Sequence, residues 1–178
     1  MRIDNGRESR NVEDRRGTRL AGRGKIGLGT IVLALVAMYF GVDPSVVLDG
    51  AGMLQPQVEQ GPAAPRSAAE NELARFSSIV LADTEDTWHA IFRAGGAQYR
   101  EPQLVLFTDA TRSACGVGQA AMGPFYCPAD QKLYLDLAFF DELRDRFRAP
   151  GDFAQAYVIA HEVGHHVQNL LGIIDKVN

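Results

Sequence analysis

The stretch "AYVIAHEVGHHVQNLLG" (residues 156–172) places three of the chain's four histidines within an otherwise apolar segment. Apolar residues recur there at intervals of three and four, a spacing that predicts an amphipathic helix. We expect the helix to begin at Asp152, as its N-cap after Pro150 and Gly151, and to end near Leu171.

Within this helix, His161 and His165 lie four residues apart, so their imidazoles share one face, one turn from each other. Two imidazoles in this arrangement can bind one zinc ion, at Zn–N distances of about 2.0–2.1 Å. Glu162 is rotated by about 100° from His161 and flanks that face. The H-E-x-x-H pattern predicts Zn²⁺ held by the two histidines. It also predicts Glu162 as the catalytic acid/base that passes a proton from water to the leaving amine.

The remaining candidate side chains have weaker signals. His166 is rotated by about 100° from His165, so we expect it beside the site or at the surface and not as a ligand. His89 adjoins Trp88 on an earlier helix and is expected to be structural. Tyr134 lies on a short strand and is expected to be packed in the interior.

The third protein ligand of a hydrolytic zinc site is not evident from the motif. The longer pattern H-E-x-x-H-x-x-G-x-x-H is absent, because Gln168 and Leu171 occupy its glycine and third-histidine positions. Asp175, the one carboxylate after His165, could serve only if the chain turns back after Gly172.

Upstream segments predict an α+β fold. The sequence "NELARFSSIVLADTEDTWHAIFRAGG" (residues 71–96) has helical periodicity, with Asp83 as a candidate break. "PQLVLFTD" and "KLYLD" have the composition of buried strands, separated by a glycine-rich loop, and "LAFFDELRDRF" is helical. The order helix, strand, loop, strand, helix, helix indicates the α+β class.

The N-terminal third has a different character. Residues 1–25 hold eight basic and four acidic side chains, although the whole chain of 178 residues has a net charge of -4. Residues 26–42 carry no charge, which predicts a single transmembrane helix. The basic head then favours a cytoplasmic N-terminus and a periplasmic or extracellular C-terminal domain. A cleaved signal peptide or a buried core helix are the alternatives.

Four prolines follow in residues 43–69, which predicts a flexible linker before a folded domain over residues 70–178. Nucleic-acid binding by the head is not expected, because acidic residues interrupt the basic ones and membrane topology already accounts for them.

Cys115 and Cys127 enclose a glycine-rich stretch, "CGVGQAAMGPFYC". In a domain outside the cytoplasm, a disulfide between them is the favoured interpretation. Two buried free thiols are the alternative. A zinc pair is disfavoured, because a separation of twelve residues is far from the spacing of metal-binding cysteines.

On the blocks "GPFYCP" and "AHEVGHHVQ", together with the basic head and apolar segment, the chain resembles the bacterial neutral zinc metallopeptidase family over nearly its whole length. The resemblance implies a membrane-anchored, zincin-like peptidase with His161 and His165 as zinc ligands and Glu162 as catalytic residue. Family members continue with a helical block whose acidic motif is the expected source of the third ligand. The chain is therefore expected to match the N-terminal part of a member, with an incomplete catalytic domain.

Two functional hypotheses follow. The first is a membrane-anchored zinc metallopeptidase, or an inactive truncated copy of one, acting on a peptide or protein substrate. The second is a non-catalytic envelope protein whose domain binds a partner or a structural metal.

Overall fold

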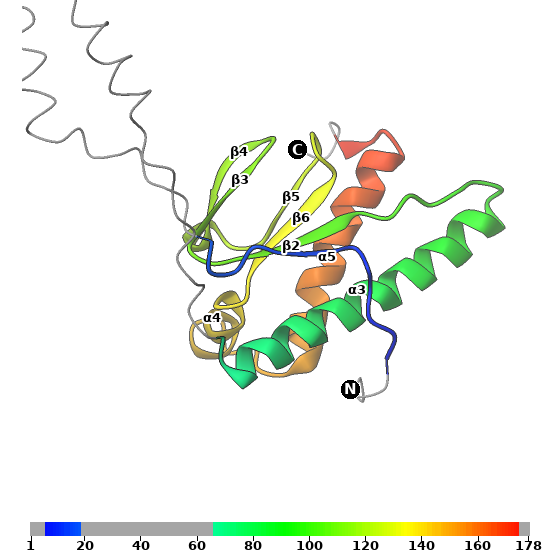
Figure 1. Ribbon diagram of the computed structural model, residues 1–178. Helices are drawn as coiled ribbons and strands as arrows, with labels where there is room; N and C mark the ends of the chain where they lie inside the picture. The colour runs from blue at the N-terminus through cyan, green and yellow to red at the C-terminus, as the bar shows by residue number, and fades with distance from the viewer. Residues whose placement is uncertain (1–5, 19–65, 175–178) are drawn as a thin grey trace, which may run out of the picture. The chain divides into compact units, whose positions relative to one another are not determined.

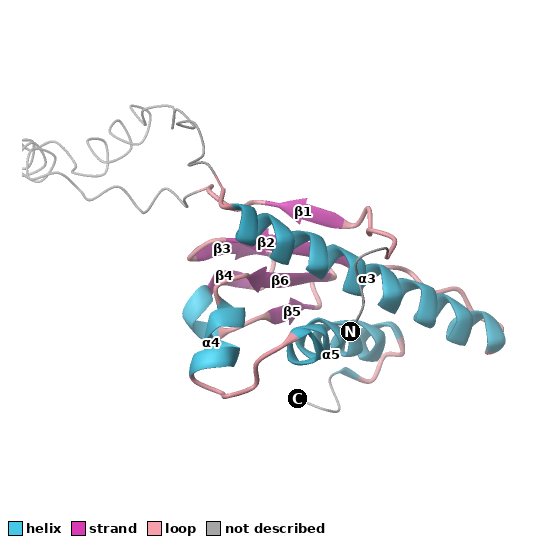
Figure 2. Cartoon of the chain, turned by 90° about the horizontal axis from the view of Figure 1, so that it is seen from below, coloured by secondary structure: helices cyan, strands magenta, loops and turns pink. Residues whose placement is uncertain are grey.

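A four-stranded sheet forms the centre of the structure, a computed structural model that describes residues 6–18 and 66–174 (Figure 1). The strand order is β1 (Val12–Asp14), β2 (Gln103–Phe107), β6 (Lys132–Asp136) and β5 (Phe125–Cys127), as Figure 2 shows. Strands β1 and β6 run parallel to β2, and β5 runs antiparallel to β6 at the edge. The α+β class predicted from the order of elements agrees with this arrangement.

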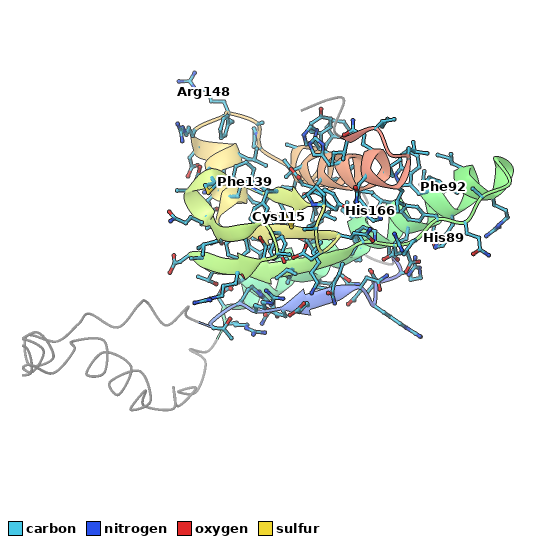
Figure 3. The ribbon with its side chains drawn as sticks, turned by 90° about the horizontal axis from the view of Figure 1, so that it is seen from above. His89, Phe92, Cys115, Phe139, Arg148 and His166 are labelled. Atoms are coloured by element: carbon cyan, nitrogen blue, oxygen red, sulfur yellow. A yellow bond between two sulfur atoms is a disulfide. The ribbon has the colours of Figure 1, made fainter. Side chains whose placement is uncertain are left out.

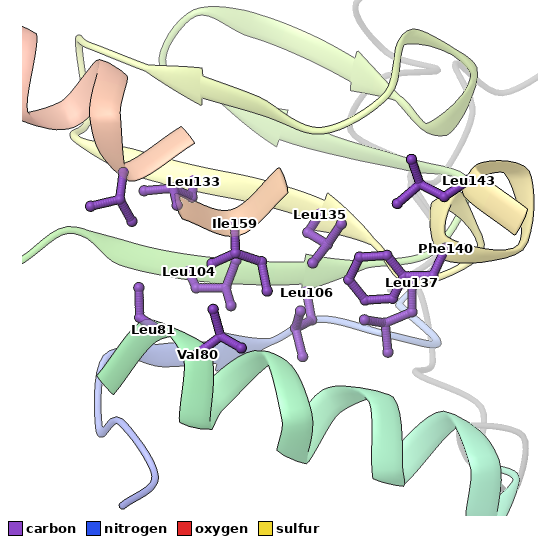
Figure 4. Packing of buried hydrophobic residues seen from close by; sticks show 11 residues of the cluster. Val80, Leu81, Leu104, Leu106, Leu133, Leu135, Leu137, Phe140, Leu143 and Ile159 are labelled. Atoms are coloured by element: carbon purple, nitrogen blue, oxygen red, sulfur yellow. The ribbon is translucent and has the colours of Figure 1, made fainter. Parts of the chain in front are cut away.

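Both central strands are buried on both faces, which explains their nearly continuous apolar sequences. Since side chains alternate along a strand, the leucines of β2 and β6 face one side, where they pack with Val80 and Ile159 from two helices (Figure 4). Val105, Phe107 and Tyr134 face the other side. The predicted packing role of Tyr134 is confirmed, because this residue is fully buried.

Three helices accompany the sheet: α3 (Ala68–Ala94), α4 (Phe139–Asp145) and α5 (Asp152–Leu170). Helix α3 is continuous, so no break occurs at Asp83, and it begins where the Ser67 side chain accepts a hydrogen bond from the Glu70 N–H (3.1 Å). The N-cap of α5 is Gly151, whose positive φ of 101° favours glycine, and Asp152 is the first helical residue instead of the cap.

The segment expected to be a loop contains an antiparallel hairpin, β3 (Ala110–Ser113) and β4 (Gly116–Gln119). Cys115 at its turn forms a disulfide with Cys127 at the end of β5, with 5.8 Å between the Cα atoms. The Phe125 ring packs against the backbone of Gly118 and stacks on Tyr134, with 4.7 Å between ring centroids. The hairpin is therefore fastened to β5 by a covalent bond and by a ring packed on its backbone.

Residues 6–18 belong to the same compact unit as residues 66–174, so they do not form a separate basic head. Strand β1 pairs with β2 in register from Val12 with Leu104. Glu85 of α3, 1% exposed, accepts hydrogen bonds from Ser9, Asn11 and Arg7. The charges of this segment, which suggested membrane topology, therefore make specific contacts within the domain.

The predicted single-pass membrane architecture is wrong. A single crossing between residues 18 and 66 would put β1 and β2 on opposite sides of a membrane, yet the two strands are hydrogen-bonded neighbours. The predicted transmembrane segment, residues 26–42, and most of the predicted linker lie outside the described residues. Among the helices that are described, none is both long enough and apolar enough to cross a bilayer.

The contacts of Arg7 provide a test of how residues 6–18 are held. Glu85→Ala is expected to lower the free energy of unfolding by about 1–3 kcal/mol, because Ser9, Asn11 and Arg7 each lose a buried acceptor. Asp86→Ala removes a 67% exposed partner of the same arginine and should cost less than about 1 kcal/mol. Urea denaturation measures both, and equal small losses would contradict this arrangement.

Candidate metal centre

Helix α5 lies against the sheet through one apolar face and presents polar groups on the neighbouring faces. Ile159 and Val163 are fully buried in the main core, and α5 contacts α3, β5 and β6. The helix is therefore fixed in its rotation about its own axis by packing on the sheet. That rotation leaves His161 exposed and His165 half-buried, and it buries Glu162 and His166.

The two motif histidines converge on one position. Their Nε2 atoms lie 3.2 Å apart, and the rings are nearly perpendicular, with an interplanar angle of 86°. Two nitrogens bound to one tetrahedral zinc at about 2.0–2.1 Å would lie about 3.3 Å apart. The donor set and its spacing therefore fit two ligands of a single zinc ion.

An open pocket of about 310 Å³ borders this position. Its walls come entirely from α5, with Tyr157 and Ala160 before the histidines, Gly164 between them and Gln168 beyond them. The Tyr157 ring lies 6.2 Å from the His161 ring and is largely exposed. The site is therefore accessible to a ligand from solvent.

Glu162 lies on the side of α5 that faces the sheet and is 9% exposed. Burial raises the pKa of its carboxyl group, while the charges of His165 and His161 and a hydrogen bond from the Tyr126 backbone N–H oppose that rise. The carboxylate thus lies within the field of both imidazoles and is held by the edge strand β5.

His166, labelled in Figure 3, is fully buried, and its two ring nitrogens have partners from other parts of the chain. Nε2 lies 2.7 Å from the Arg100 carbonyl oxygen, which can only accept, so Nε2 carries the proton. Burial lowers the pKa of His166, which leaves Nδ1 free to accept from the Tyr126 hydroxyl at 3.0 Å. The Tyr126 oxygen accepts in turn from Asn169 (3.0 Å). His166 therefore joins α5 to the sheet and is not placed as a metal ligand.

Tyr126 is the residue of this region that the sequence did not reveal. Its backbone N–H and its hydroxyl together reach Glu162, His166 and Asn169, which share one face of α5 over two turns. The position of Tyr126 within the block "GPFYCP" was the only available signal, and it carried no information about which helix would lie opposite.

The other residues considered from the sequence lie elsewhere. His89 pairs with Glu101 (2.7 Å) and packs on Tyr99, in agreement with a structural role. Within residues 6–18 and 66–174, no group of three or more His, Cys, Asp or Glu side chains is placed to hold a metal ion. Asp175, the candidate third ligand, lies outside the described residues.

The family model described as "Putative neutral zinc metallopeptidase" matches residues 1–178. This chain belongs to that family. The resemblance noted from the sequence blocks is thereby confirmed, and the family's name implies zinc as its metal and a peptide or protein as its substrate.

The chain is similar to proteins of Escherichia coli and Mycobacterium tuberculosis. The chain is 49% identical over 187 residues to "Uncharacterized protein YpfJ" of Escherichia coli (strain K12), an alignment that covers 99% of this chain and 64% of the relative. It is 36% identical over 142 residues to "Uncharacterized protein Rv2575" of Mycobacterium tuberculosis (strain ATCC 25618 / H37Rv), covering 79% of this chain and 48% of the relative. The chain thus spans less than two thirds of the length of either. No solved structure matches it.

Two tyrosines, the half-buried Tyr126 and the buried Tyr99, provide a test of the contacts around His166. Tyr126→Phe removes a hydroxyl that makes two hydrogen bonds, and we expect it to lower the free energy of unfolding by about 1–3 kcal/mol. Tyr99→Phe removes a buried hydroxyl that has no hydrogen-bond partner in the described part of the chain, so its effect should be near zero or stabilising. Thermal or urea unfolding compares them, and a cost for Tyr99→Phe as large as that for Tyr126→Phe would contradict the network.

Proposed function

We propose that this domain carries the catalytic motif of a zinc-dependent metallopeptidase that hydrolyses peptide bonds. The observation that carries the proposal is the convergence of the His161 and His165 Nε2 atoms, 3.2 Å apart, on the helix that also carries the buried carboxylate of Glu162. Membership of the neutral zinc metallopeptidase family supports the same conclusion.

His161 and His165 would hold the metal through their Nε2 atoms. Zinc, when bound, supplies Lewis-acid polarisation and lowers the pKa of a coordinated water to about 7. Since both histidines come from one helix, their spacing depends mainly on the local geometry of α5. The ligand pair is therefore in place as soon as α5 is folded.

Glu162 would act as the general acid/base. Its carboxylate accepts a proton from the attacking water and passes that proton to the nitrogen of the departing amine. The rise in the pKa of Glu162 through burial suits this role, because an acid/base whose pKa lies nearer the working pH exchanges its proton more readily.

The substrate would approach along the exposed face of α5. The pocket there is open and bordered by an aromatic ring, Tyr157, one turn before His161. Phe153, a further turn back, is 77% exposed. These rings offer apolar surface next to the reacting position, which suits the side chain of a peptide or unfolded protein segment.

We also propose that the domain works outside the cytoplasm. The disulfide between Cys115 and Cys127 supports this location, because such bonds persist in oxidising compartments and are rare in the cytosol.

Conservative substitutions of the carboxylate test the proposal. In the full chain, Glu162→Gln should keep bound zinc and lower the cleavage of a fluorescent casein substrate at least about 100-fold, because it removes the group that moves the proton. Glu142→Gln changes an exposed carboxylate of α4 and should leave both properties unchanged.

His161→Ala should abolish stoichiometric zinc, measured by elemental analysis of the purified chain. If the unaltered chain is folded but binds no zinc, the proposal is contradicted. Zinc binding without any cleavage would instead favour a non-catalytic protein with a structural metal.

A further inference from the structure

Gln168 lies at the opposite end of the pocket from Tyr157 and contacts His165, one of the two candidate zinc ligands. Its Oε1 atom lies 3.0 Å from Nδ1 of His165, three residues earlier on the same helix face. An amide oxygen can only accept a hydrogen bond, so the contact requires the proton of the imidazole to be on Nδ1. A neutral imidazole has one N–H, and the Nε2 atom of His165 is then a bare lone pair.

That lone pair belongs to the atom that faces the candidate zinc position. His165 Nε2 is the atom that lies 3.2 Å from His161 Nε2. The ring nitrogen that binds a metal is set by the hydrogen bond that the other ring nitrogen makes. Gln168 is the residue that supplies such a bond to His165.

The two histidines are not equivalent in this respect. Because Nε2 of His165 is bare, it can accept a hydrogen bond from the Nε2–H of His161 across the 3.2 Å contact, or the two Nε2 atoms can share a cation once the His161 proton is on Nδ1. His161 is exposed, so its proton can move from Nε2 to Nδ1 through solvent when a cation arrives. His165 needs no such change.

We propose that Gln168 is a positioning residue that selects the Nδ1–H tautomer of His165 and so prepares its Nε2 atom to bind the cation. The part that concerns zinc rests on the function proposed above, whereas the tautomer of His165 in the metal-free chain does not. Residues that hold the second ring nitrogen of a ligand histidine typically change metal affinity 10–100-fold when substituted.

The first experiment measures the tautomer directly in the full, metal-free chain. Long-range ¹H–¹⁵N spectra of the histidine side chains, recorded above neutral pH, should show His165 with its proton on Nδ1. In Gln168→Leu the Nδ1–H population of His165 should fall. Finding His165 with its proton on Nε2 in the unaltered chain would overturn the proposal.

The second experiment measures the dissociation constant for Zn²⁺ alone by competition with a chromophoric chelator. Gln168→Leu should raise it about 10-fold or more, and Gln168→Glu, which keeps an acceptor at the same place, should return it to the unaltered value or below. Gln155→Leu on the same helix is the control for a surface glutamine, since Gln155 does not border the pocket. Thermal unfolding should be the same for both leucine variants, which separates a positioning role from a structural one.

Equal zinc affinity in Gln168→Leu and Gln155→Leu would overturn the proposal. If the unaltered chain binds no zinc, the metallopeptidase function fails, and the spectra still decide whether Gln168 sets the tautomer of His165.

Discussion

The packing of α5 on the sheet is the constraint on which the candidate site depends. A helix that carries His161, Glu162, His165 and His166 has polar groups on three adjacent faces, and only one rotation about its axis satisfies all of them. Burying Ile159 and Val163 selects that rotation, and it is the one that gives His166 two partners and leaves the ligand pair facing solvent. The packing of α5 on the sheet therefore determines both the hydrophobic core and the positions of the motif side chains.

Tyr126 shows how a three-residue edge strand can be joined to the helix that carries the motif residues. Phe125 and Cys127 face the hairpin, and Tyr126, between them, faces α5, because side chains alternate along a strand. The disulfide and the ring packed on Gly118 hold one face of β5, and α5 covers the other. The face of α5 that carries His166 and Asn169 is thus bonded to a strand that is itself fixed on both sides.

The sequence predicted the local features well. The two central strands and the three described helices depend on spacings of two to four residues, which periodicity reveals. The same spacing singled out His161, Glu162 and His165, whose roles as zinc ligands and acid/base stay predictions. The hairpin escaped prediction because three of the residues from 116 to 123 are glycines, which hide the alternation of a strand. Of the two places expected for His166, the surface is wrong, because the residue is fully buried. One helical step from His165 says nothing about what lies opposite.

The N-terminal segment shows that contacts between residues far apart in the chain are also hidden from local sequence patterns. Arg16, 4% exposed, bonds Asp14 and the backbone of Glu70, more than fifty residues away. A cluster of basic residues before an apolar run has the composition of a segment that sets membrane orientation. A strand whose charged side chains are paired within a folded domain can have the same composition, and no local pattern tells the two apart. The pairing becomes visible only once β1 is placed beside β2.

The site therefore separates into a local part and a long-range part. The spacing of His161 and His165 is a property of α5 alone, and the contact of Gln168 with His165 lies within the same helix. The burial of Glu162 depends instead on the packing of α5 against the sheet, which brings in strands from earlier in the chain. If His161 and His165 bind the metal and Glu162 moves the proton, as proposed, changes within β5 should affect proton transfer without altering the spacing of the two histidines.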